Sequence, residues 1–141
     1  MRVRLDHIGI AVKDLEAGSE FWRLLGLEQG GDESVQSQGV NVRFFESHDP
    51  TDSGSHRPPR IELLEATGPD TPIGRFLTRH GPGVQQVAFR VDDLESLLLR
   101  LSSAGVRLID RTARTGAGGC RMAFVHPEST GGVLVELVQD E

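Results

Sequence analysis

The chain repeats the segment His7-Ile-Gly-Ile-Ala-Val-Lys-Asp-Leu-Glu16 as Gln86-Val-Ala-Phe-Arg-Val-Asp-Asp-Leu-Glu95. The offset is 79 residues, since 86 − 7 = 79, and without a gap it also aligns Leu25-Gly26-Leu27 with Ala104-Gly105-Val106. A strand, the start of a helix and the end of that helix therefore recur in register. Self-similarity at a fixed distance indicates a repeated supersecondary unit, so we expect two copies of one module.

Each copy is predicted to fold as β-α-β-β-β. In the first copy, the alternation of apolar residues and the turn signals predict a strand over 4–12, a helix from Asp14 to Gly26, and strands near 27–35, 40–46 and 61–64. In the second copy they predict a strand over 84–91, a helix over 93–104, and strands near 107–112, 119–125 and 132–138. Because most connections are short turns, sheets that curl around a shared cavity fit better than a doubly wound parallel sheet.

We expect both modules to form one domain, because 141 residues suit a single core or two small modules packed together. Module one is predicted at about 1–66, a connecting segment with a short helix at about 67–82, and module two at about 83–141. Segment 46–59 is polar and rich in Gly, Pro, Ser and Asp, and it is predicted to be a mobile hairpin loop.

Composition excludes several classes of function. The net charge of −6 and the absence of a Lys/Arg cluster argue against a nucleic-acid partner. The single cysteine, Cys120, rules out an internal disulfide. The sequence enters an alternating strand pattern at once and has no apolar stretch of membrane-spanning length. We therefore expect a soluble cytoplasmic protein with no membrane partner.

Four polar residues in apolar strands are the candidate site. His7 shares a strand face with small residues, and Gln86 takes the matching position in the second copy. Glu62 and Glu136 each lie among aliphatic residues in the last strand of a copy, where a lone buried carboxylate is unfavourable unless it is paired or binds a cation.

Taken singly, each of these residues is more often a hydrogen-bonded or solvated position than a ligand. Their repeat-matched positions change that balance, because a pseudo-twofold axis would bring such positions together at one centre. One imidazole, two carboxylates and one amide oxygen make a suitable site for a divalent metal with positions left open for substrate.

Several motifs resemble the methylmalonyl-CoA epimerase family of the vicinal oxygen chelate (glyoxalase/bleomycin resistance) superfamily. They are Leu5-Asp-His-Ile-Gly-Ile-Ala-Val12, Pro69-Asp-Thr-Pro-Ile73, Gly116-Ala-Gly-Gly119 and His126-Pro-Glu-Ser-Thr-Gly-Gly-Val-Leu-Val-Glu-Leu137. The first motif is shared by many members of the superfamily, whereas the last is much closer to the epimerases. The resemblance covers nearly the whole chain except the loop from 46 to 60.

The resemblance implies an α+β fold in which two tandem βαβββ modules form a cup-shaped, barrel-like mixed sheet around a divalent metal. The family's ligand positions fall on His7, Glu62, Gln86 and Glu136. Gln86 is a departure, since these epimerases usually have a second histidine there. The ions to consider are Co²⁺, Mn²⁺, Zn²⁺, Ni²⁺ and Mg²⁺, and an oxygen ligand in place of nitrogen favours the harder ones.

The activity implied is interconversion of (2R)- and (2S)-methylmalonyl-CoA by removal of the C2 proton through a metal-stabilised enediolate. Two acid/base groups are needed, for which Glu136 is the first candidate and Glu62 the symmetry-related one. Some epimerases have a further glutamate where this chain has Val42. Arg121, Gly131 and Gly132 are candidates to border the CoA, and the family suggests a homodimer.

Two other functions stay open from the sequence. A glyoxalase-type isomerase or lyase acting on a glutathione-like hemithioacetal fits a ligand set with one glutamine. A non-catalytic module that binds a small molecule in the same cup is a third reading, which the retention of Glu62 and Glu136 disfavours.

Overall fold

The computed structural model describes residues 1–47 and 57–140. The chain divides into two compact units, the first made of residues 7–85 and the second of residues 86–141 together with 1–6. The elements in chain order are β1 (Val3–Val12), α1 (Leu15–Leu25), β2 (Glu28–Val35), β3 (Val40–Glu46), β4 (Arg60–Ala66), α2 (Pro72–His80), β5 (Gly83–Val91), α3 (Leu94–Ser103), β6 (Arg114–Thr115), β7 (Arg121–Val125) and β8 (Val135–Gln139).

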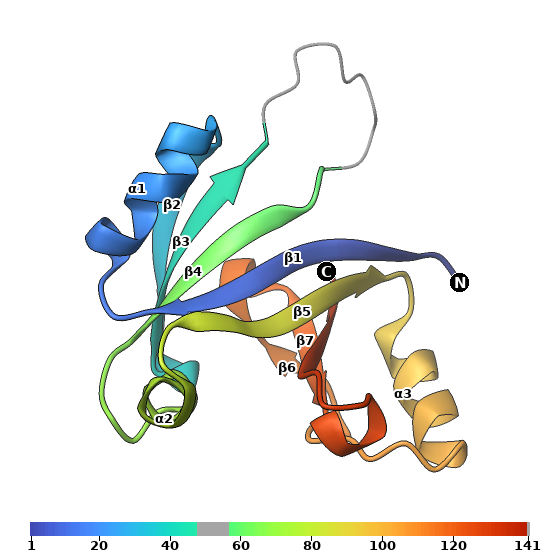
Figure 1. Cartoon of the computed structure of the whole chain (residues 1–141). Coiled ribbons are helices and arrows are strands. Elements are labelled where there is room, and N and C mark those ends of the chain that lie inside the picture. The colour runs from blue at the N-terminus through green and yellow to red at the C-terminus, as the bar shows by residue number, and fades with distance from the viewer. Residues whose placement is uncertain (48–56, 141) are drawn as a thin grey trace. The chain divides into compact units, whose positions relative to one another are not determined.

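The first unit is a mixed sheet in the order β2-β3-β4-β1, with α1 against β3 and β4 (Figure 1). β1 is parallel to β4, and the other neighbours are antiparallel. Its buried core combines both kinds of element, with Phe45 and Leu63 fully buried beneath Leu15 of α1.

The second unit repeats this plan in the order β5-β8-β7-β6, with α3 in contact with β8. β5 is parallel to β8, and the remaining neighbours are antiparallel. Leu94, Leu97 and Leu98 present one face of α3 to Ala123 and Leu137. The predicted α+β class with two βαβββ modules is confirmed.

The start of each helix shows that the repeat extends to single hydrogen bonds. The Leu15 N–H donates to Glu65 Oε2 at 2.9 Å, and the Leu94 N–H donates to Gln139 Oε1 at 2.6 Å. The first pair of residues is 79 apart (94 − 15) and the second is 74 apart (139 − 65). A side chain from the last strand thus satisfies an otherwise unpaired helix N–H in both units.

The predicted helix ends are confirmed. The side chain of Asp14 accepts from the Ala17 N–H at 2.8 Å, and Asp93 does the same for Ser96 at 3.1 Å. Gly26 ends α1 with φ of 110°, a left-handed conformation that favours glycine.

The predicted strand over 107–112 is wrong. Only Leu108 forms a bridge, to Val125, while the N–H groups of Ile109 and Asp110 both donate to the Phe124 carbonyl. The Asp110 side chain accepts from the Phe124 N–H at 2.8 Å, so a carboxylate replaces the backbone partner that a ladder would supply. The edge strand forms further on instead, as the two-residue β6.

Two other strands begin later than predicted. The predictions over 119–125 and 132–138 correspond to β7 and β8. Gly118, Gly119, Gly131 and Gly132 all have positive φ, which keeps these positions in turns. Residues 48–56 of the predicted loop lie outside the described residues.

Among residues 1–47 and 57–140, no helix combines the length and the apolar composition needed to cross a bilayer.

A charged network ties β2, β3 and α1 together on the surface of the first unit. Arg43 donates through Nε and Nη2 to the two carboxylate oxygens of Asp32, both at 2.9 Å, and through Nη1 to Glu16 at 2.9 Å. These hydrogen bonds hold the pKa of Asp32 below its ordinary value of 3.8 and the pKa of Glu16 below 4.5. Both carboxylates therefore stabilise the folded state while they are ionised.

We expect Arg43→Met to lower the melting temperature most at neutral pH. Because the folded pKa values are the lower ones, the stabilisation is present above the unfolded values and disappears as the pH falls through the folded ones. The gap between the variant and the parent should close below roughly pH 3. Thermal unfolding followed by circular dichroism across pH 2–8 measures it.

Arg75→Met is the matched control, because Arg75 donates to a backbone carbonyl, that of Asp70. Its effect should not depend on pH. An Arg43→Met deficit that stays constant down to the lowest pH would contradict the electrostatic explanation.

Candidate functional site

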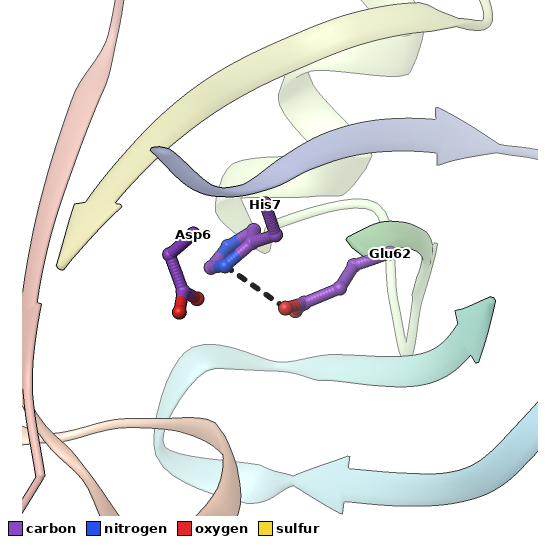
Figure 2. A group of neighbouring side chains, drawn as sticks. All are labelled: Asp6, His7 and Glu62. Carbon is purple, nitrogen blue, oxygen red and sulfur yellow. Dashed lines mark ion pairs between the residues drawn. The ribbon is translucent and has the colours of Figure 1, made fainter. Parts of the chain in front are cut away.

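In the first unit, the parallel pairing of β1 and β4 brings His7 to Glu62. The register sets Gly9 opposite Glu62, so both lie on the face that also carries His7, two residues earlier on the strand. His7 Nδ1 lies 2.9 Å from Glu62 Oε2, as Figure 2 shows. His7 is 4% exposed and Glu62 is 3% exposed, so the polar pair is almost fully removed from solvent.

In the second unit, the parallel pairing of β5 and β8 brings Gln86 to Glu136. Ala88 lies opposite Glu136, and the Gln86 amide donates from Nε2 to Glu136 Oε2 at 2.5 Å. Gln86 is 8% exposed and Glu136 is 6% exposed. This amide supplies a hydrogen-bond donor to the carboxylate but no positive charge.

The two pairs are equivalent by the repeat. Gly9 and Ala88 are 79 residues apart, whereas Glu62 and Glu136 are 74 apart (136 − 62), the same offset that relates Glu65 to Gln139. In both units a small residue lies opposite the glutamate, and the polar partner lies two positions before it. The structure therefore brings the four predicted ligands together as two pairs, one within each unit.

A cation also contacts the first pair. Arg60 Nη2 lies 3.5 Å from Glu62 Oε2, the oxygen that faces His7. The sequence reasoning overlooked Arg60, although its position two residues before Glu62 on the same strand places both side chains on one face.

Asp6 is a second residue that the sequence reasoning missed. It directly precedes His7 in the chain, is 6% exposed, and is drawn beside it in Figure 2. Arg90 donates from Nε to Asp6 Oδ1 at 2.8 Å, within the second unit. The available signal was an aspartate inside an otherwise apolar strand, which requires a buried partner.

The predicted CoA contacts lie in two places. Arg121 begins β7, forms an ion pair with Glu95 of α3, and borders a cavity of about 420 Å³ lined also by Leu98 and Leu108. Gly131 and Gly132 lie in the turn before β8.

Strand pairing keeps these two groups apart. Arg121 pairs with Gln139 at one end of β7 and β8, whereas Val125 pairs with Val135 at the other end, next to the two glycines. Arg121 and the glycines therefore lie at opposite ends of this pair of strands, and a ligand that touches both must span its length.

Comparisons with known proteins agree on the family. Residues 6–124 match the model of the Glyoxalase/Bleomycin resistance protein/Dioxygenase superfamily. The chain belongs to this superfamily. The resemblance to the methylmalonyl-CoA epimerases, drawn above from sequence motifs, is confirmed by the relatives within it.

Three similar proteins illustrate the match. An uncharacterised protein of Bacillus subtilis, YqjC, is 42% identical over 137 residues, which are 96% of this chain and 91% of that protein. The mitochondrial methylmalonyl-CoA epimerase of Bos taurus is 34% identical over 138 residues, 96% of this chain and 74% of that protein. A methylmalonyl-CoA epimerase solved in complex with methylmalonyl-CoA and NH₄⁺ is 36% identical with a TM-score of 0.89, covering 99% of this chain and 96% of that one.

Proposed function

We propose that this superfamily member is an isomerase, a metal-dependent epimerase that interconverts (2R)- and (2S)-methylmalonyl-CoA. The observation that carries the proposal is the pair of repeat-matched buried contacts, His7 with Glu62 and Gln86 with Glu136. It is supported by the 34% identity to the bovine epimerase and by the similarity to an epimerase solved with methylmalonyl-CoA.

The donor chemistry of the two pairs fits a divalent ion. Buried carboxylate, imidazole and amide groups are ligands for Mn²⁺, Co²⁺, Ni²⁺, Zn²⁺ or Mg²⁺. In our proposal His7, Glu62, Gln86 and Glu136 hold one such ion, Gln86 through Oε1 because its Nε2 is directed at Glu136. When bound, the ion supplies Lewis-acid stabilisation of the negative charge that develops on the thioester oxygen.

Two glutamates then share the proton transfer. Inversion at C2 requires removal of a proton on one face and return of a proton on the other. Glu136 is proposed as one of these groups and Glu62 as the other. The hydrogen bond from Gln86 orients the Glu136 carboxylate, and His7 fixes Glu62 through the same oxygen that Arg60 approaches.

The remaining parts of the proposal concern the substrate and the setting of the enzyme. Arg121, Gly131 and Gly132 are proposed to border the CoA portion of an acyl-CoA substrate. The enzyme is proposed to work in the cytoplasm as a homodimer, as the family resemblance suggests.

We expect Glu136→Gln to abolish turnover, because the amide cannot accept the C2 proton. Loss of a general base typically lowers the rate by about 10²–10⁴-fold. Conversion of (2S)- into (2R)-methylmalonyl-CoA by the metal-loaded variant, followed with a stereospecific coupled assay, measures it.

The matched control is Glu128→Gln, which removes an exposed carboxylate paired with Arg107 in the same unit and should retain activity. Full activity in Glu136→Gln would refute its role as base.

We expect Gln86→His to bind Co²⁺ or Zn²⁺ at least as tightly as the parent, because imidazole nitrogen is a better ligand for these ions than an amide oxygen. Isothermal titration of the metal-free protein measures it. Gln85→His is the control, since neighbouring residues of a strand point to opposite faces. Weaker binding in Gln86→His would show that Gln86 is not a ligand.

A further inference from the structure

Arg60 is a largely buried cation whose hydrogen bonds are incomplete. Its side chain is 16% exposed, with Nη2 3.5 Å from Glu62 Oε2 and Nη1 3.8 Å from Glu46 Oε1. Its Nε is buried and has no hydrogen-bond partner among the described residues. A buried guanidinium is stable when its donors are matched, so Arg60 lacks a well-placed acceptor.

Arg43, on the neighbouring strand β3, shows what a satisfied arginine of the same unit is like. It forms two parallel 2.9 Å bonds to Asp32 and a third to Glu16. Arg43 and Arg60 carry the same charge at side-chain exposures of 12% and 16%, so burial does not explain their difference. The difference lies in the carboxylate that each one has within reach.

The orientation of Arg60 leaves its edge available for a partner. The guanidinium carbon lies 4.4 Å from the centre of the Phe44 ring, and Phe44 pairs with Glu62 across β3 and β4. Stacking on the ring uses one face of the guanidinium and fixes its plane. Its coplanar N–H donors match the geometry of a carboxylate, which a lysine does not.

The proposed substrate brings such a carboxylate to this place. Methylmalonyl-CoA carries a free carboxylate on C2, the atom that Glu62 and Glu136 are proposed to serve. Two glutamates already balance the charge of a divalent ion, so the carboxylate of the substrate needs another positive charge nearby. Arg60 is positioned beside Glu62 to supply it.

We propose that Arg60 binds the free carboxylate of the substrate and thereby selects 2-carboxyacyl thioesters over simple acyl-CoA. The proposal rests on the proposed function, which supplies a substrate with that group. Arg60 shifts its hydrogen bonds from Glu62 to the incoming carboxylate, and it determines specificity without taking part in proton transfer.

The test compares methylmalonyl-CoA with propionyl-CoA, which has the same acyl chain and CoA but lacks the carboxylate. Dissociation constants are measured by isothermal titration for the parent and for Arg60→Met, at one fixed Mn²⁺ concentration. We expect Arg60→Met to weaken methylmalonyl-CoA binding by about tenfold or more and propionyl-CoA binding by less than about threefold. Arg23→Met removes an arginine that pairs with Glu16 on α1 and should change neither constant.

The results separate the two proposals. Equal weakening of both ligands in Arg60→Met, or unchanged discrimination between them, would overturn the role of Arg60 even if epimerase activity is found. Loss of discrimination in Arg60→Met supports that role even if the parent proves unable to epimerise its ligand. A parent that binds both thioesters equally well would also overturn it.

Discussion

A carboxylate buried in the last strand of each unit is the constraint on which the candidate site depends. Glu62 and Glu136 are 3% and 6% exposed, and a carboxylate so removed from water is unfavourable unless neighbours compensate it. The parallel pairing of the first and last strands supplies this compensation, because it sets His7 beside Glu62 and Gln86 beside Glu136. Strand register, a backbone property, thus determines which side chains meet.

The two units use one scaffold with different chemistry. Glu65 and Gln139 both accept from a helix N–H, so an ionised and a neutral side chain serve the same structural purpose. The same exchange of an ionisable for a neutral group distinguishes His7 from Gln86, at positions where the consequence is chemical. An imidazole and an amide differ as ligands and as hydrogen-bond donors, so the two glutamates lie in different environments. That asymmetry suits a reaction that requires two acid/base groups with different tasks.

Much of this could be predicted from the sequence because the repeat supplies its own alignment. The helix starts at Asp14 and Asp93 and the four site residues follow from it, since the same polar residue types recur in both copies. The edge of the second sheet could not be predicted, because Asp110 satisfies the Phe124 N–H with its side chain and prevents a regular ladder. Arg60 and Asp6 were missed because their importance lies in their partners, Glu62 and Arg90, which are distant in sequence or on another strand.

The most direct test of the account is hydrogen exchange at C2 of the substrate. Protein loaded with a divalent ion is incubated with (2S)-methylmalonyl-CoA in D₂O, and deuterium at C2 is followed by mass spectrometry. The account predicts that deuterium enters C2 as the (2R) epimer accumulates, and that both processes stop when the ion is removed with a chelator. Absence of exchange with every one of Co²⁺, Mn²⁺, Zn²⁺, Ni²⁺ and Mg²⁺ would contradict it.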